Sequence, residues 1–143
     1  MVEEIPNIIG IKECEPSFNQ FTDLIRRVGD KITVLSGDEF LAVTEFIYGA
    51  KGAIMATANL IPDVWVKMWN LVNEGKIEEA VNMNIEYYPL FKAIFKETNP
   101  GPLKEALKMA GLPAGYLSTP LTAPNADTLE ALKQAMRAMR LLK

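Results

Sequence analysis

The sequence has 143 residues, of which 49% are hydrophobic and 23% charged, a composition that supports one folded core and excludes a disordered chain. Its formal net charge of −3, with no cluster of Lys and Arg among aromatic residues, argues against a nucleic-acid partner. No window approaches the ~20 consecutive apolar residues of a membrane span. The start of the chain carries Glu3 and Glu4 in place of a basic leader segment. We therefore expect a cytoplasmic protein with no membrane partner.

The residue types that are absent exclude several kinds of catalytic site. The chain has no histidine and a single cysteine, Cys14, so it lacks a Ser-His or Cys-His nucleophile and a His or thiolate zinc site. Its glycines do not form a dinucleotide-binding fingerprint, and its acidic residues do not have calcium-loop spacing. We therefore expect no cofactor. We also expect Cys14 to be a small buried or half-buried thiol.

The first predicted strand ends in a candidate nucleophile. Residues 7–12 form an apolar run that closes at Lys12. An ammonium at the end of a buried strand is partly desolvated, which lowers its pKa and leaves some amine free to attack a carbonyl. The alternative is a lysine that simply extends its ammonium into water.

Three apolar runs predict strands of a parallel sheet, since each is followed by a helical pattern. The runs are residues 7–12, 32–36 and 52–57. They are continuously apolar, as expected when both faces of a sheet are covered. The helices that follow are expected to end near Gly29, Gly49 and Gly75, with Asp38 capping the second and Pro62 in the first turn of the third.

From about residue 76 the sequence predicts helices only. The expected ranges are about 76–97, with a perturbation at Pro89, then 102–110 and 126–142. Between the last two, residues 112–125 are rich in proline and small residues, which is typical of a meandering surface connection.

Five short motifs occur in an order and spacing that resemble those of a known family. They are Gly10-Ile11-Lys12-Glu13, Leu35-Ser36-Gly37-Asp38, Gly49-Ala50-Lys51-Gly52-Ala53-Ile54, Ala58-Asn59 and Asn99-Pro100-Gly101-Pro102-Leu103-Lys104. The whole chain resembles the carboxy-terminal half of the dihydrodipicolinate synthase and N-acetylneuraminate lyase family of class I aldolases. It is most similar to the synthase branch.

This resemblance implies an α/β fold that is part of a TIM (β/α)8 barrel, with about three parallel βα units corresponding to strands six to eight. We divide the chain accordingly into a partial barrel, residues 1–75, and a helical carboxy-terminal extension, residues 76–143. Lys12 matches the catalytic lysine that forms an imine with pyruvate or a related 2-oxo acid. Gly37 matches a loop close to the substrate and Ile54 an apolar pocket wall. From the residues alone, these two are a turn glycine and a core isoleucine.

The resemblance also implies the chemistry. The protonated imine withdraws electrons, so the adjacent methyl group loses a proton and becomes a carbon nucleophile. In the synthase branch the acceptor is aspartate semialdehyde and the product feeds lysine biosynthesis, whereas the lyase branch cleaves an acyl sugar acid. The segment Cys14-Glu15-Pro16-Ser17 departs from the family's small-residue pattern and leaves the substrate preference open.

Half of the family's barrel is not in this sequence. A complete barrel takes about 250 residues, and Lys12 lies so near the start that the first five strands have no counterpart. The family's proton-relay tyrosine and its Thr-Thr carboxylate-binding segment belong to that half. None of the chain's own tyrosines stands in the family's proton-relay motif. These tyrosines are Tyr48, Tyr87, Tyr88 and Tyr116.

Two hypotheses of function follow. The first is a truncated Schiff-base lyase or aldolase that uses Lys12, weak or inactive alone. The second is a non-catalytic half-barrel whose main property is self-association, because three barrel strands leave exposed edges and apolar surface. Under either hypothesis the expected partner is a second copy, in a homo-oligomer, or a complementary chain that supplies the amino-terminal half.

Overall fold

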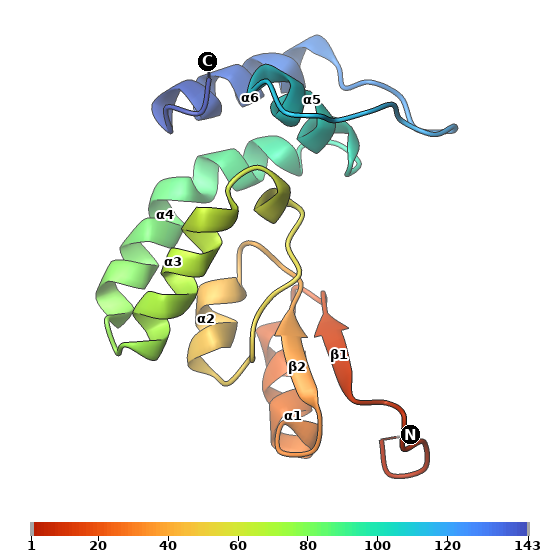
Figure 1. Cartoon of the computed structure of the whole chain (residues 1–143), viewed down its shortest axis with the longest axis vertical. Coiled ribbons are helices and arrows are strands. Elements are labelled where there is room, and N and C mark those ends of the chain that lie inside the picture. Colours follow the sequence, from red (N-terminus) through yellow and green to blue (C-terminus); the bar gives the residue numbers. More distant parts are fainter. Residues whose placement is uncertain (1, 143) are drawn as a thin grey trace. The chain divides into compact units, whose positions relative to one another are not determined.

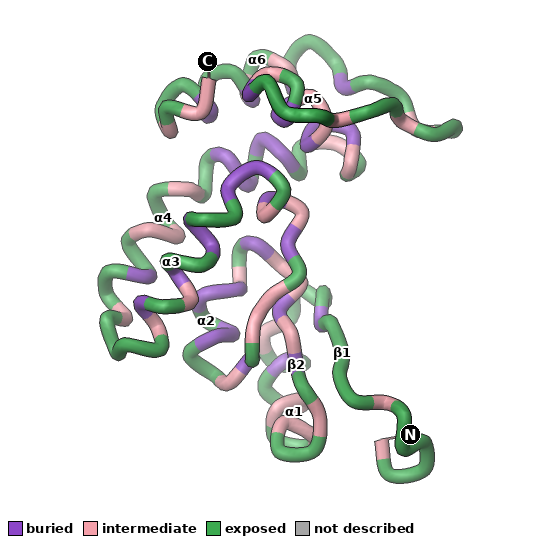
Figure 2. The backbone as a smooth tube through the Cα atoms, in the orientation of Figure 1, coloured by how far each residue is buried: buried purple, intermediate pink, exposed green. Residues whose placement is uncertain are grey.

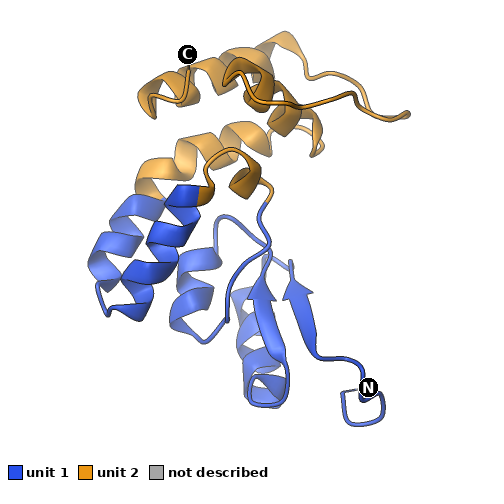
Figure 3. Cartoon of the chain, in the orientation of Figure 1, with its two compact units in different colours: residues 1–55, 63–84 blue, residues 56–62, 85–143 orange. Residues whose placement is uncertain are grey.

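The computed structural model describes residues 2–142, which form an α/β structure in which strands and helices alternate at the start and only helices follow (Figure 1). The chain divides into two compact units (Figure 3). The first comprises residues 1–55 and 63–84, and the second comprises residues 56–62 and 85–143. The first unit carries the strands, and the second consists of helices and connections.

The first unit contains a short parallel sheet. Strand β1 (Gly10–Glu13) pairs with strand β2 (Thr33–Ser36), with Lys12 opposite Leu35 and Ile11 opposite Val34. The parallel pairing confirms the βα organisation expected from the sequence.

The third predicted strand is reduced to a single bridge. Ser36 of β2 pairs with Ala53 in parallel, and the Ile54 amide donates to the Ser36 carbonyl at 2.9 Å. No strand spans residues 52–57, because the chain turns into a short 3-10 helix at Thr57–Asn59. The expectation of three full strands is therefore wrong for the described residues: the backbone starts the ladder but bends away after Ile54.

The strand alternation places Lys12 and Ile54 on one face of the sheet. Paired residues of parallel strands share a face, so Lys12 lies on the face of Leu35. Ser36 and Ala53 lie on the opposite face, which puts Ile54 back on the face of Leu35. We call Lys12, Leu35 and Ile54 the lysine face, and Val34 and Ser36, which are buried, the helix face.

The helices lie close to the ranges that periodicity and terminal residues predict. Their bounds are Phe18–Val28 (α1), Ala42–Ile47 (α2), Pro62–Asn73 (α3), Ile77–Ile94 (α4), Gly101–Met109 (α5) and Ala126–Ala138 (α6). Gly29 is the C-cap of α1, and Pro62 opens α3, as expected. The Asp38 carboxylate accepts the amides of Phe40 and Leu41, which stabilises the turn into α2.

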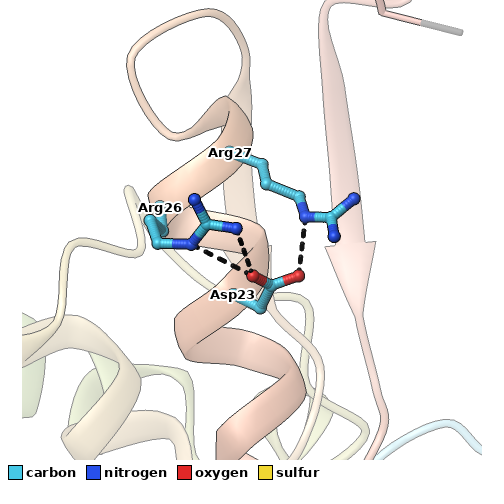
Figure 4. Close-up of polar contacts among 3 residues, drawn as sticks. All are labelled: Asp23, Arg26 and Arg27. Atoms are coloured by element: carbon cyan, nitrogen blue, oxygen red, sulfur yellow. Dashed lines mark hydrogen bonds and ion pairs between the residues drawn. The ribbon is translucent and has the colours of Figure 1, made fainter.

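The core of the first unit is formed by helix residues and β2. Phe21 and Met68 are fully buried, and Trp65 is also buried, so the Met68 and Trp65 side chains are core residues. Figure 2 shows buried positions along α2, α3 and β2, while β1 is mostly exposed. The surface of α1 carries an ion-pair cluster, in which Asp23 accepts from Arg26 at 2.8 Å and Arg27 at 2.7 Å (Figure 4).

The second unit is held by caps as well as by its core. Asn125 caps α6 by accepting the Thr128 amide at 2.9 Å, and the Glu97 carboxylate accepts the Asn125 amide at 3.0 Å. The nearby Thr128 side chain, followed by the Asn125 amide, lowers the pKa of Glu97. Within the described chain, no helix has the length and apolar character needed to cross a membrane.

Candidate functional site

Lys12 lies at the carboxyl end of β1, as the sequence predicts. The following residue, Glu13, fixes the turn that leaves the strand: its carboxylate accepts the amides of Cys14 at 3.0 Å and Glu15 at 2.7 Å. The Gln20 side-chain amide of α1 reaches the same carboxylate at 3.4 Å. The strand end that carries Lys12 is therefore held by a buried carboxylate and not by the lysine itself.

Gly37 lies directly against the Lys12 side chain. A β-carbon added at Gly37 would stand 2.7 Å from Lys12 Cε and 2.6 Å from the Glu13 carbonyl oxygen, distances that real side chains do not reach. The Cys14 sulfur is at least as close to that point. The structure therefore brings Lys12 and Gly37 together, and only glycine fits where the β2 loop passes the lysine.

Ile54 shares the lysine face but lies on the surface. Its side chain is 51% exposed, so it is not a core isoleucine. Leu35 of β2 lies on the same face. The segment that carries Ile54 passes close to it, since a β-carbon added at Gly52 would lie 3.4 Å from the Leu35 side chain. An exposed aliphatic side chain beside a candidate substrate lysine is compatible with a pocket wall that the described residues do not close.

The burial of the first strand differs from the sequence expectation. Lys12 is exposed, and Ile9 and Ile11 are 78% and 39% exposed, so the predicted partial desolvation of the ammonium is wrong for the described residues. Cys14, expected to be buried or half-buried, is also exposed. The physical reason is that β1 pairs with β2 alone in the described sheet, which leaves its other edge without a neighbouring strand.

Two of the tyrosines have structural contacts away from Lys12. The Tyr48 ring packs edge-on against Phe18 with centroids 4.6 Å apart, and Lys92 lies 6.0 Å from the Tyr88 ring centroid. The backbone carbonyl of Tyr116 accepts from Lys104. We assign no proton-transfer role to these residues. No group of three His, Cys, Asp or Glu side chains in the described part of the chain could hold a metal ion.

The structure buries one carboxyl group, that of Glu45, which the sequence does not predict to be buried. The pattern of α2 predicts Phe40, Val43, Phe46 and Ile47 as its apolar face. Instead, Phe40 and Ile47 are 37% and 43% exposed, whereas Glu45 is fully buried. Burial raises the pKa of the Glu45 carboxyl, an effect that the nearby Ser36 hydroxyl partly offsets. A single glutamate in a mostly apolar helix carries no sequence signal of its burial.

Comparison with known proteins assigns this geometry to a family. The sequence profile of the dihydrodipicolinate synthetase family matches residues 1–139. The 4-hydroxy-tetrahydrodipicolinate synthases of Thermodesulfovibrio yellowstonii and Methanocaldococcus jannaschii are 42% and 39% identical to the chain, over 98% and 99% of its length.

The crystal structure of dihydrodipicolinate synthase from Aquifex aeolicus superposes with a TM-score of 0.92 at 31% identity, over 99% of this chain and 48% of that one. The chain likewise spans 48% of the length of each of the two sequence relatives. With matches of this extent in both sequence and structure, the chain belongs to the dihydrodipicolinate synthetase family.

Proposed function

We propose that the chain carries the imine-forming half of a pyruvate-dependent Schiff-base aldolase, with Lys12 as the nucleophile and with Gly37 and Ile54 as substrate contacts. Residues 1–75 would be part of a (β/α)8 barrel, and residues 76–143 its helical extension. The family supports this assignment, because the two sequence relatives described above are both named 4-hydroxy-tetrahydrodipicolinate synthase. The observation that carries it is the contact distance between Lys12 Cε and the Gly37 position.

The proposed chemistry starts at the Lys12 amine. Its uncharged form adds to the ketone carbon of pyruvate, and loss of water gives an imine that takes up a proton. The cationic imine draws electrons from the adjacent methyl group, which loses a proton to become an enamine. The enamine carbon then attacks an aldehyde acceptor, and water releases the product and restores the amine.

The geometry supports a substrate that approaches over the β2 loop. Since Gly37 has no side chain, its backbone can pass directly beside Lys12 Cε and the Glu13 carbonyl oxygen, where any other residue would clash, so the loop stays close to the proposed nucleophile. Ile54 presents an apolar side chain on the same face, suited to the methyl end of pyruvate. No described residue of the lysine face supplies a tyrosine, so proton transfer would rely on water or on a partner chain.

Borohydride trapping with pyruvate tests this proposal. Reduction fixes the imine as a stable secondary amine, which intact mass and peptide mapping then locate. We expect an adduct on Lys12 that is lost in Lys12→Ala and retained in Lys67→Ala, an exposed lysine on α3. Folded protein that gives no adduct, or adducts spread over several lysines, would refute the assignment.

A second proposal, supported by the exposed first strand, is that the chain self-associates or binds a complementary half-barrel. The free edge of β1 exposes backbone groups that can pair with another strand, and Ile9 and Ile11 lie exposed along it. A symmetric dimer would cover this surface. So would the first five βα units of a family relative supplied as a separate chain.

Analytical ultracentrifugation at micromolar concentration separates these arrangements. We expect a species larger than the monomer, or a stable complex when the complementary half is added. A compact monomer that also forms no complex with the added half would refute the partner proposal. If the complementary half raises the rate of Lys12 trapping, the same experiment links assembly to chemistry.

A further inference from the structure

Two polar side chains are buried without partners beneath the end of β2. Ser36 and Glu45 are both fully buried, and the Ser36 hydroxyl and both Glu45 carboxyl oxygens lack a hydrogen-bond partner in the described structure. A buried carboxylate that accepts no hydrogen bond is costly, whereas an uncharged carboxylic acid in the same place is far less so. Something must therefore keep Glu45 uncharged or compensate its charge.

The charged groups around Glu45 do not compensate it. Those that act on it most strongly are Asp38, from the loop after β2, and Glu13, from β1, and both are carboxyls. Each disfavours a negative charge on Glu45, in the same direction as burial. Only the Ser36 hydroxyl acts in the opposite direction, and it does so from nearby, without a well-formed hydrogen bond to the carboxyl group.

Resting on the function proposed above, we propose that Glu45 is a positioning residue for the Lys12 site: as an uncharged acid it holds the Ser36 end of β2 in place, and its ionisation loosens the turn at Gly37. Glu45 does not touch substrate in this arrangement. It acts through Ser36, the residue that immediately precedes Gly37.

The backbone around Glu45 explains how such a change would reach Gly37. The Ser36 carbonyl accepts the Ile54 amide, and the Ser36 amide donates to Gly52, so this residue joins β2 to the segment that carries Ile54. The Glu45 carbonyl accepts the Ala50 amide at the start of that same segment. A charge on Glu45 is repelled by Asp38, which immediately follows Gly37, and by Glu13, which follows Lys12, and it therefore disturbs both Gly37 and the segment of Ile54.

The direction of the pH dependence follows from the raised pKa. An acid whose pKa is higher in the folded than in the unfolded state contributes stability that is fully present below its unfolded pKa and is lost as pH rises through its folded pKa. Each unit of difference between the two pKa values changes the folding equilibrium constant about tenfold. Folding should therefore weaken from mildly acidic to alkaline pH.

The experiment compares wild type with Glu45→Gln, an uncharged variant of nearly the same shape. Urea unfolding from pH 5 to pH 9 should show stability falling with pH in wild type and constant in Glu45→Gln, with the variant more stable at pH 9. Ser36→Ala should steepen the fall, because it removes the hydroxyl that favours ionisation. Glu86→Gln, which alters an exposed glutamate of α4, should keep the wild-type slope.

Two NMR readouts test positioning without relying on the imine. The carbon-13 signal of the Glu45 carboxyl should titrate above the usual glutamate range, and the Gly37 amide signal should move with the same midpoint in wild type but not in Glu45→Gln. The proposal is overturned if the Glu45 carboxyl titrates with a midpoint in the usual glutamate range, or if the Gly37 amide signal does not change with that titration. If Glu45→Gln does not fold, Glu45→Leu replaces it, with the same flat dependence expected.

The last readout separates this proposal from the proposed function. The ratio of Lys12 trapping rates in wild type and Glu45→Gln, measured side by side at each pH, should fall as pH rises. A ratio that is constant with pH overturns the positioning role even if Glu45 titrates as expected. If no variant forms an adduct, the proposed function fails, while the Gly37 signal still decides whether Glu45 holds the turn.

Discussion

Strands β1 and β2 each form part of an apolar run of the sequence, but their surroundings differ. β2 lies between β1 and the bridge at Ala53, and its Val34 is 1% exposed. β1, at the edge, leaves Ile11 39% exposed although Ile11 and Val34 are directly paired. The comparison teaches that the strand that carries the candidate nucleophile, Lys12, is the more exposed of the two. Stability should therefore depend on β2, and chemistry and association on β1.

Truncation of this matched pair gives the largest expected difference. Val34→Ala removes fully buried methyl groups and leaves a cavity, so we expect it to lower the free energy of unfolding by roughly 2 to 3 kcal/mol. Ile11→Ala removes more atoms but from a partly exposed site, and should cost clearly less. Urea unfolding of both variants measures the difference. Equal costs would mean that β1 is as well buried in solution as β2, which would point to a covered edge.

The Gly37 turn, where the two strands meet at Lys12, should be nearly as sensitive. Gly37→Ala forces a methyl group against Lys12 Cε and the Glu13 carbonyl, so we expect a loss of roughly 1 to 3 kcal/mol. The trapped Lys12 adduct should fall with it. Gly101→Ala is the control, since a β-carbon there would lie at an ordinary 3.5 Å from its nearest neighbour. An unchanged adduct in Gly37→Ala would show that the turn does not shape the site.

The positions of the helices and the parallel order could be predicted because they depend on local signals. The spacing from Phe18 to Val28, with Gly29 after it, predicts α1, and Pro62 predicts the start of α3. Lys12 and Gly37 were placed together by their motifs, and the contact at Lys12 Cε agrees.

What the sequence could not predict depends on neighbours far along the chain. The apolar run of residues 52–57 is as strand-like as the others, but a strand forms only where a partner pairs with it over its length. The exposure of Lys12 is likewise decided by which elements cover β1, and the burial of Glu45 by the packing of α2. Neither leaves a local pattern.

The exposed side chain next to β1 should control association with a smaller effect. Ile9→Lys places a charge on a residue that is 78% exposed, while its backbone carbonyl still accepts the Thr33 amide. If this surface is covered in an oligomer, the change should weaken the oligomer about tenfold, which corresponds to about 1.4 kcal/mol. Val66→Lys, at a 59% exposed position on α3, should leave the oligomer unchanged in sedimentation. An effect of equal size in both variants would contradict an interface at β1.

The smallest expected effect is on α1, where Asp23→Asn removes a surface ion-pair cluster whose arginines are exposed and whose Asp23 side chain is 46% exposed (Figure 4). The Arg26 hydrogen bond, followed by the Arg27 charge, lowers the pKa of Asp23. An acid with a lowered pKa contributes stability above its unfolded pKa and loses it as pH falls through the folded value, which is opposite to the effect of Glu45. Because the pair is exposed and screened by water, we expect Asp23→Asn to unfold like wild type at neutral pH. Any small difference should be present at neutral pH and disappear in acid solution, where Asp23 of the wild type is protonated and its stabilising effect is lost. A large loss at neutral pH would mean that α1, and with it the Gln20 contact to Glu13 behind Lys12, is held by its surface charges and not by its buried Phe21.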